Sequence, residues 1–444
     1  MRESRHKASV ALAGLAVAAT SVLAAGGATA GAATGHKTPT IGAHPHYVVA
    51  GQVTANPHET TFSCQTTSPA ACYGPKQIRA AYGVDKLATQ HGADGAGRTI
   101  VIIDSFQSPT IRHDLQTFDA LFGLPDPVFN QIAPDGLTPF DQSDPNQVGW
   151  AGEITLDVEW AHAIAPAAKI DLVLAKSNND PDILSATRYA VNHRLGQVVS
   201  QSFGEAETCM DPHVLQQQHA LFQKATDRGI TLLASSGDQG SAQPTCDNTS
   251  YFKSASTPAS DPNVTAVGGT RLFANGISGR YQREKVWNEP NYNAAGGGGY
   301  SVVYGTPKYQ RPLHLPSRGV PDVSYNAAIV GGVLAVWSSS GQGQNLVFRF
   351  GGTSAGSPQW AGLVALADQV GKKHTLGNIN DDLYRLARGS KYGDRYNDVT
   401  RGNNTYHGVA VTVAGFQATP GWDAASGLGT PKADVLIPKL AGVK

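Results

Sequence analysis

Short apolar runs alternate with longer amphipathic segments along most of this chain, and this alternation limits the possible folds more than any other feature. Five such runs are TIVIID (99–104), KIDLVLA (169–175), QVVSQSFG (197–204), ITLLASSG (230–237) and NVTAVGG (263–269). Candidate helices lie at 76–90, 150–165, 180–193, 211–228 and 354–370. Runs that are apolar on both faces are typical of parallel strands covered by helices on each side. We therefore expect an α/β fold with a doubly wound, mostly parallel sheet, and a functional site at the carboxyl ends of its strands.

The N-terminus predicts export from the cell. Three basic residues within the first seven precede the uncharged run ASVALAGLAVAATSVLAAGGATAGAA (8–33), which ends in small residues. This order of charge and apolar residues is typical of a secretory signal peptide, here 1–33, with cleavage after Ala30 or Ala33. An uncleaved membrane anchor is the alternative, although the many Ala and Gly residues would make a weak span. Residues 34–72, rich in Thr, Pro, Gly and His, are expected to form a short, poorly ordered leader before one large domain, 73–444.

Charge and cysteine content agree with a secreted protein. Charged residues make up only 15% of the chain, and 34 Lys and Arg balance 34 Asp and Glu, so nothing indicates binding to nucleic acid or to a membrane after signal cleavage. We expect an extracellular monomer. The chain has four cysteines, which allow three disulfide pairings. We expect Cys64–Cys72 and Cys209–Cys246, because each closes one local loop.

A serine between glycines is the first candidate for chemistry. Ser354 lies in GGTSAGSP (351–358), after the apolar run NLVFRF, and fits the G-x-S-x-G pattern of a nucleophile at a sharp strand-to-helix turn. The same pattern also describes an ordinary serine at the start of a helix. A nucleophilic serine needs a base, and Asp398 and His407 follow it in the order of an esterase of the α/β-hydrolase type. Only residues 355–444 remain for the rest of that fold, and none of the 14 histidines has a convincing context.

Carboxylates offer a different base. Glu153 and Asp157 are spaced i, i+4 in GEITLDVEWAHAIAP (152–166), so they share one face of the predicted helix. Close carboxylates tend to share a proton, which raises one pKa and permits proton transfer at acid pH. Asp238 follows the strand ITLLA in SSGDQG (235–240), where a protonated carboxyl could donate a hydrogen bond to an oxyanion. A helix N-terminus and an Asx turn would explain these acids equally well without a catalytic role.

Nine motifs together give the chain a resemblance to the sedolisins, or serine-carboxyl peptidases. In family order they are YGPKQIRAAYG, GEITLDVEWAHAIAP, SSGDQG, VTAVGGT, GGGGYS, PDVSYNA, GGTSAGSP, YNDVTRGN and GWDAASGLGTP, from Tyr73 to the C-terminus. The resemblance implies a subtilisin-like fold with Ser354 as nucleophile and Glu153 as general base and acid. It further implies that Asp157 orients Glu153 and that Asp238 helps to form the oxyanion hole.

The resemblance also implies one structural calcium ion. The matching positions are the carboxylates of Asp398 and Asp423 and the main-chain oxygens of Val399, Thr419 and Gly421. An all-oxygen ligand set suits Ca²⁺. The chain departs from the family at Thr419, where Gly is usual, and at Gly356, where a small polar residue is common.

The implied function is that of a secreted peptidase acting on proteins or peptides at acid pH, either as an endopeptidase or in the tripeptidyl manner. Sedolisins usually carry a long N-terminal prodomain, and the residues between the expected signal cleavage and Tyr73 are too few for one. A secreted esterase that uses His407, and a non-catalytic binding protein on a peptidase fold, are the alternatives.

Overall fold

The computed structural model describes residues 42, 45–53, 61–371 and 375–442, which all belong to one unit, Pro39–Lys444. Its main sheet has eight strands in the order β13-β12-β8-β6-β3-β5-β4, with β18 also paired to β12. The strands are β3 (Thr99–Ser105), β4 (Phe129–Ile132), β5 (Lys169–Ala175), β6 (Val198–Gln201), β8 (Thr231–Ser235), β12 (Val264–Ala274), β13 (Tyr281–Val286) and β18 (Val323–Asn326). Every pairing is parallel except β12 with β13. The expected mostly parallel sheet is therefore confirmed.

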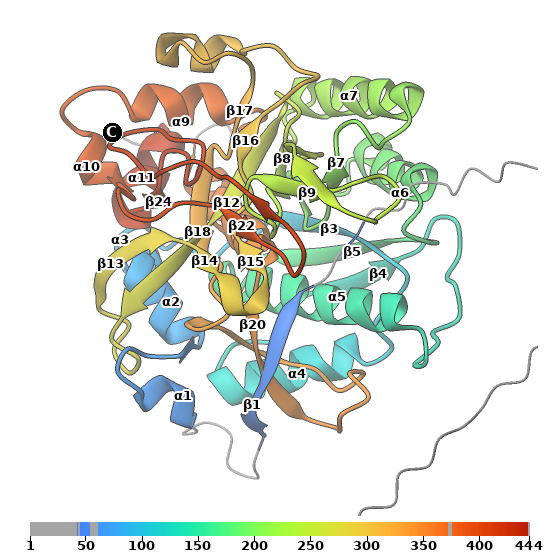
Figure 1. Cartoon of the computed structure of the whole chain (residues 1–444). Helices are drawn as coiled ribbons and strands as arrows, with labels where there is room; N and C mark the ends of the chain where they lie inside the picture. Colours follow the sequence, from blue (N-terminus) through green and yellow to red (C-terminus); the bar gives the residue numbers. More distant parts are fainter. Residues whose placement is uncertain (1–41, 43–44, 54–60, 372–374, 443–444) are drawn as a thin grey trace, which may run out of the picture. The chain divides into compact units, whose positions relative to one another are not determined.

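Helices cover both faces of this sheet (Figure 1). Successive residues of β3 show the two faces: Ile100 and Ile102 belong to one apolar core, whereas Val101 and Ile103 belong to another. The first core is closed mainly by α5 (Pro145–Ile164) and α8 (Gly356–Val370), and the second by α6 (Asp180–His193) and α7 (Pro212–Asp227). Because side chains alternate across a strand, the continuous apolar runs predicted this double burial.

The predicted helices are present, with two differences: one is divided into two helices, and another begins earlier than expected. The helix expected at 76–90 is two helices, α2 (Pro75–Tyr82) and α3 (Val84–His91), because Gly83 takes a left-handed conformation with φ +77° and ends the first of them. The helix expected from 150 begins at Pro145, where the Asp144 side chain accepts a hydrogen bond from the backbone N–H of Asn146.

Helices α5 and α8 approach each other closely, which matters for the site. A Cβ added at Gly362 of α8 would lie 2.7 Å from the Ile164 side chain, so only glycine permits this approach. On α5, a Cβ at Gly152 would lie 3.1 Å from the Trp337 ring. Both helices therefore pack with little freedom to shift; α5 carries Glu153 and Asp157, and α8 begins two residues after Ser354.

A smaller sheet corrects the prediction for residues 34–72. Strand β1 (His46–Gln52) pairs antiparallel with β20 (Leu346–Gly351) in a four-stranded sheet of order β1-β20-β19-β2, and Tyr47 packs against Trp337. The remaining strands are β2 (Cys72–Tyr73) and β19 (Gly332–Val336). The expectation of poor order is wrong for 45–53 and 61–72, because the run YVVA is β-branched enough to pair with β20. The signal peptide 1–33, and residues 34–41, 43–44 and 54–60 of the leader, lie outside the described residues.

Both expected disulfides are present, Cys64–Cys72 and Cys209–Cys246. In the part of the chain that the structure describes, no helix is both long enough and apolar enough to cross a bilayer.

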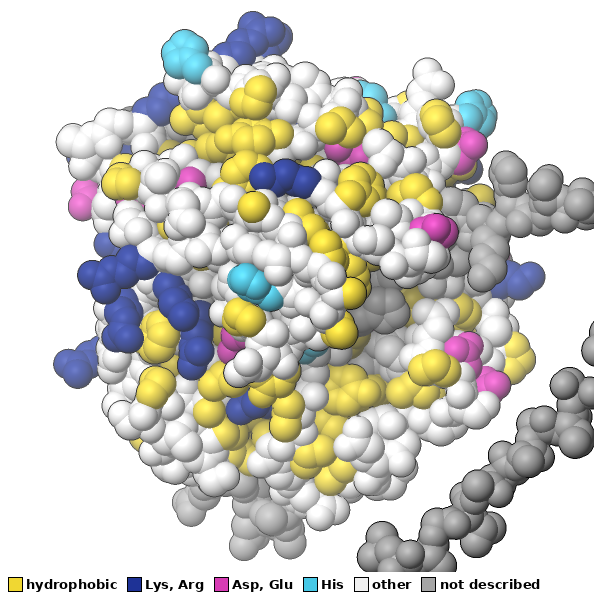
Figure 2. Space-filling view, viewed as in Figure 1, with side chains coloured by type: hydrophobic (Ala, Val, Ile, Leu, Met, Phe, Trp, Pro, Cys, Tyr) yellow, Lys and Arg dark blue, Asp and Glu magenta, His cyan; other side chains and the backbone are white. Residues whose placement is uncertain are grey.

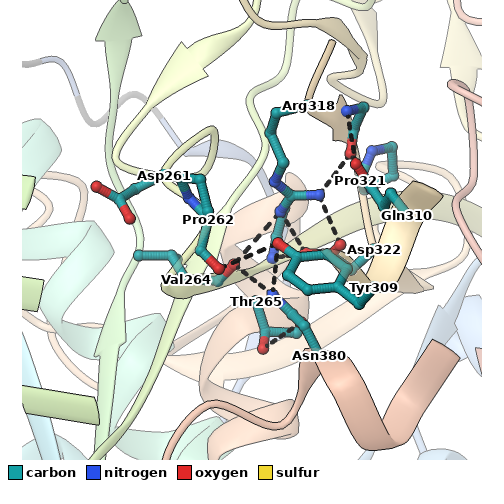
Figure 3. A network of polar contacts seen from close by, with 12 residues as sticks. Asp261, Pro262, Val264, Thr265, Tyr309, Gln310, Arg318, Pro321, Asp322 and Asn380 are labelled. Carbon is teal, nitrogen blue, oxygen red and sulfur yellow. Dashed lines mark hydrogen bonds and ion pairs between the residues drawn. The ribbon is translucent and has the colours of Figure 1, made fainter. Parts of the chain in front are cut away.

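A buried polar network fixes the segment before β18 to the main sheet (Figure 3). The Arg318 guanidinium donates to both oxygens of Asp322, at 2.7 and 2.6 Å, and neither residue is exposed. Asp322 also accepts from the backbone N–H of Ala266 on β12 at 2.8 Å. The Asn380 amide donates to the Val264 carbonyl of the same strand at 2.9 Å. The network therefore joins β12, the 318–322 segment and α9 (Asn380–Leu386).

Candidate active site

Ser354 lies at a sharp turn between strand and helix, as its sequence context predicts. Strand β20 ends at Gly351, and a short 3-10 turn, η4 (Thr353–Ala355), leads into α8. Gly352 has φ +134°, and a Cβ there would lie 2.7 Å from a carboxyl oxygen of Asp238, so no other residue fits. Ser354 is 7% exposed at the wall of a cleft, and its hydroxyl donates to the Ser202 carbonyl at 3.3 Å.

Glu153 and Asp157 are brought to this serine by α5, and both are completely buried. Burial raises the pKa of Glu153 well above its usual value, and the nearby Asp157 raises it further, whereas the Ser354 hydroxyl acts in the opposite direction. Burial likewise raises the pKa of Asp157, with Asp104 adding to it and the Ser202 hydroxyl opposing it. The predicted nucleophile and the predicted carboxyl pair therefore share one site.

Asp104 is a third buried carboxyl that the sequence did not assign to this set. It lies near the end of β3, is not exposed, and has a pKa raised well above its usual value by burial and then by Glu153. Its position at the end of a central strand was a usable signal, because the carboxyl ends of parallel strands meet at the site. Three neighbouring carboxyls that are buried away from water cannot all be ionised, so they share protons with one another.

Asp238 is hydrogen-bonded to the turn that carries Ser354. One of its oxygens accepts from the backbone N–H and from the hydroxyl of Thr353, both at 2.8 Å. Asp238 also contributes to the raised pKa of Glu153. Asp238 lies just after β8 and lines the cleft beside Ser354, as an oxyanion-hole residue would.

The cleft has a volume of about 350 Å³, and Figure 2 shows this face hollowed between β9 (Ala242–Pro244) and α5. The disulfide Cys209–Cys246 holds one wall. Gly42 enters the cleft and forms an antiparallel β-bridge with Gly204. The backbone at Gly204, two residues after Ser202, is therefore open to antiparallel pairing within the cleft.

Histidine does not take part in this arrangement. Among the described residues that line the cleft there is none. His407 lies exposed on the short strand β22 (Tyr406–His407). His162 is buried on α5, where its Nε2 lies 3.0 Å from Asp119. The geometry gives no support to the esterase alternative.

The five positions predicted for calcium lie together near the C-terminus. The Gly421 N–H donates to both oxygens of Asp398, at 3.3 and 3.1 Å, and the Thr419 N–H donates to Asp423 at 2.9 Å. The Ser426 hydroxyl is 3.1 Å from Asp423 and 3.5 Å from the Val399 carbonyl. No group of three or more His, Cys, Asp or Glu side chains suited to a metal occurs within the described ranges. The candidate metal ligands here are two carboxylates and backbone oxygens, which fit a hard cation such as Ca²⁺.

Comparison with known proteins identifies the family. A model described as the subtilase family matches residues 148–379. Kumamolisin of Bacillus sp. (strain MN-32) is 35% identical over 379 residues, or 83% of this chain and 63% of the relative. Sedolisin of Pseudomonas sp. (strain 101) is 34% identical over 351 residues, or 76% of this chain and 56% of the relative. The chain thus spans somewhat less than two thirds of the length of these two relatives.

A solved structure supports the same assignment. Pseudomonas sedolisin (serine-carboxyl proteinase), complexed with two molecules of pseudo-iodotyrostatin, matches with a TM-score of 0.70 at 30% identity, and the match covers 83% of this chain and 97% of that one. The fold is therefore subtilisin-like, as the nine motifs implied. On sequence and structure alike, the chain belongs to the sedolisin family of serine-carboxyl peptidases.

Proposed function

We propose that this protein is a secreted serine-carboxyl peptidase that hydrolyses peptide bonds of proteins or peptides at acid pH. One observation carries the proposal: the Ser354 hydroxyl lines a cleft and lies next to a buried carboxyl, Glu153, where the described lining contains no histidine. Family membership agrees with this chemistry.

In the proposed reaction, Ser354 Oγ attacks the carbonyl carbon of the substrate and its proton passes to the Glu153 carboxylate. The carbonyl oxygen becomes an oxyanion, to which protonated Asp238 donates a hydrogen bond. The C–N bond then breaks, and the leaving amine takes the proton from Glu153, which leaves an ester on Ser354. Water attacks this ester while Glu153 takes one of its protons, and that proton returns to Ser354 as the acid product departs.

Asp157 and Asp104 set the protonation of Glu153. Because each carboxyl raises the pKa of a neighbour, a proton held on Asp157 or Asp104 makes a charge on Glu153 less costly. A raised pKa also makes ionised Glu153 a stronger base than a free carboxylate. These residues act through Glu153 and not on the substrate.

We also propose that one calcium ion stabilises the C-terminal part of the chain. Asp398 and Asp423 would supply carboxylate ligands, and Val399, Thr419 and Gly421 would supply main-chain oxygens. Such an ion supplies structural cross-linking and takes no part in the reaction. The extracellular location is supported by the two disulfides, which persist in oxidising compartments.

The test is cleavage of a peptide library at about pH 4, with products identified by mass spectrometry. The protein should cleave peptides, and Ser354→Ala should lower the rate roughly 10⁴-fold or more while the fold is kept, as judged by circular dichroism. Comparable cleavage by the folded Ser354→Ala protein would remove Ser354 from the mechanism.

A further inference from the structure

A second pair of buried carboxyls lies apart from the catalytic set, and one of its members, Glu205, lines the cleft while the other, Asp180, lies behind it. Glu205 follows Gly204 directly and begins β7 (Glu205–Ala206), and Asp180 is the first residue of α6. Glu205 is 8% exposed and lines the cleft, and Asp180 is 3% exposed. One oxygen of each, Glu205 Oε1 and Asp180 Oδ1, is buried without a hydrogen-bond partner among the described residues. A polar group buried in this way is costly unless a ligand satisfies it.

The described residues that line the cleft offer this pair no positive charge. The described lining of the cleft contains no Lys or Arg. Burial, and then Asp180, raise the pKa of Glu205 to about 9. Burial raises the pKa of Asp180 to about 6, with Asp211 adding to it and the bond to Glu205 opposing it. Among the described residues, the charged groups that shift the pKa values of the pair are its own two members and Asp211, which is also an acid.

The Gly42 bridge shows where a bound peptide would meet this pair. Its pairing with Gly204 is antiparallel, and the Ser202 carbonyl accepts from the Ser354 hydroxyl. A peptide paired in the same way runs from Gly204 towards Ser202, and so reaches Ser354 after it passes Gly204. Glu205, next to Gly204, therefore lies beside residues on the N-terminal side of the cleaved bond.

We propose that Glu205 and Asp180 form a specificity subsite for a Lys or Arg side chain of the substrate, on the N-terminal side of the cleaved bond. The proposal rests on the peptidase function proposed above. A cation placed between the two carboxyls would give the unpartnered oxygens a donor and form charge-assisted hydrogen bonds. Asn146 and Asn178, which also line this part of the cleft, offer further polar contacts to a long side chain.

The subsite should respond to pH. Near pH 4 both carboxyls are protonated, so a cation gains little over a neutral side chain of the same shape. As the pair loses its first proton at about pH 6, it acquires a charge and the basic side chain is favoured. A preference for Arg over citrulline, a neutral near-isostere, should therefore rise by about fivefold or more between pH 4 and pH 6.5.

The experiment uses internally quenched peptides with Arg or citrulline at each of four positions before the cleaved bond. The ratio of kcat/KM for each pair cancels any loss of activity common to both peptides. Wild type should show the rising preference at one position, and Glu205→Gln and Asp180→Asn should each flatten it there. Asp247→Asn is the matched control: this exposed acid, with a pKa lowered to about 2 by Thr245 and Thr249, lies between cleft residues Cys246 and Asn248 and should leave the preference intact.

Binding separates this inference from the proposed function. Calorimetry on the Ser354→Ala protein with the same Arg and citrulline peptides should show the same pH-dependent preference without turnover. Equal affinities at about pH 6.5, or a preference unchanged in both Glu205→Gln and Asp180→Asn, would overturn the subsite even if peptides are cleaved. Preferential Arg binding by a protein that cleaves nothing would instead count against the peptidase function alone.

Discussion

At the scale of single residues, the assignment of proton transfer to Glu153 distinguishes this site from a histidine-based one. Glu153→Gln removes the proton acceptor and keeps the side-chain volume, so kcat should fall roughly 10³-fold or more. His407→Ala and His162→Ala should retain most of the activity, because His407 is exposed and His162 pairs with Asp119. Steady-state rates on one peptide check this. A folded but inactive His407→Ala protein would instead favour the esterase alternative.

The pH dependence of the rate tests Asp238. A histidine base works as neutral imidazole, and its rate rises towards pH 7–8. The proposed set replaces imidazole with carboxyls and needs a proton on its oxyanion donor, so activity should peak on the acid side, at around pH 3–5, and be lower at pH 7. Asp238→Asn carries a donor that does not titrate, so this variant should be slower yet keep more of its own maximum at about pH 6–7. The test is to record pH–rate profiles of the wild type and of Asp238→Asn, with folding checked at each pH. A neutral optimum in the wild type would refute the carboxylate mechanism.

The spatial grouping of the candidate residues was predictable where a motif spanned several positions, and it was not predictable for lone acids. Ser354, Glu153, Asp157 and Asp238 lie in short motifs, and the structure brings all four together. Asp104 and Glu205 are single carboxyls at strand ends, and the sequence cannot say which strands are neighbours. Their importance comes from burial and from a partner far along the chain, such as Asp180 for Glu205.

At the scale of elements, the central strands were predictable because each is buried on both faces. Strand β1 was not, because HYVVAGQ stands in a polar, Pro-rich stretch and gains its order only by pairing with β20. The break at Gly83 was missed for a related reason. A single glycine is tolerated within a helix, so Gly83 alone does not predict a break. Its positive φ ends α2 and lets α3 start in a new direction.

The network that holds β12, the 318–322 segment and α9 together predicts a large stability change. Asp322→Asn leaves the Arg318 charge buried without its partner, and should lower the free energy of unfolding by about 3–5 kcal/mol. Asp382→Asn is the control: its pair with Arg385 has the same 2.6 Å distance, but the side chains are 46% and 59% exposed, so its loss should cost less than about 1 kcal/mol. Urea unfolding measures both, and equal effects would show that burial does not set the strength of the pair.

At the scale of the whole molecule, the proposed calcium ion should act on stability alone. A ligand that binds the native state stabilises it by mass action, so EDTA should lower the melting temperature. Its proposed ligands lie outside the described lining of the cleft, so any loss of activity should follow unfolding. Calorimetry with and without EDTA, together with elemental analysis, checks this. An unchanged melting curve in a protein that contains no calcium would dispose of the site.

The buried carboxyls make the stability of the whole molecule depend on pH. Burial raises the pKa values of Asp104, Glu153, Asp157 and Glu159 above those of the unfolded chain, so the folded state binds these protons more tightly. Their contribution is complete below about pH 4 and is lost as pH rises through the folded pKa values. The melting temperature should therefore be higher near pH 5 than near pH 8, by several degrees.

Calorimetry on the Ser354→Ala protein measures this dependence without self-digestion. Glu159→Gln in the same background provides a comparison, because Glu159 lies on α5 and accepts from the Val336 N–H at 2.9 Å, apart from the proposed chemistry. Removing one titrating carboxyl should make the fall in melting temperature between about pH 5 and pH 8 smaller, since fewer protons are then taken up on folding in this range of pH. A protein more stable near pH 8 than near pH 5 would mean that these carboxyls are ionised in the folded state at little cost. Proton sharing among Asp104, Glu153 and Asp157 would then lose its physical basis.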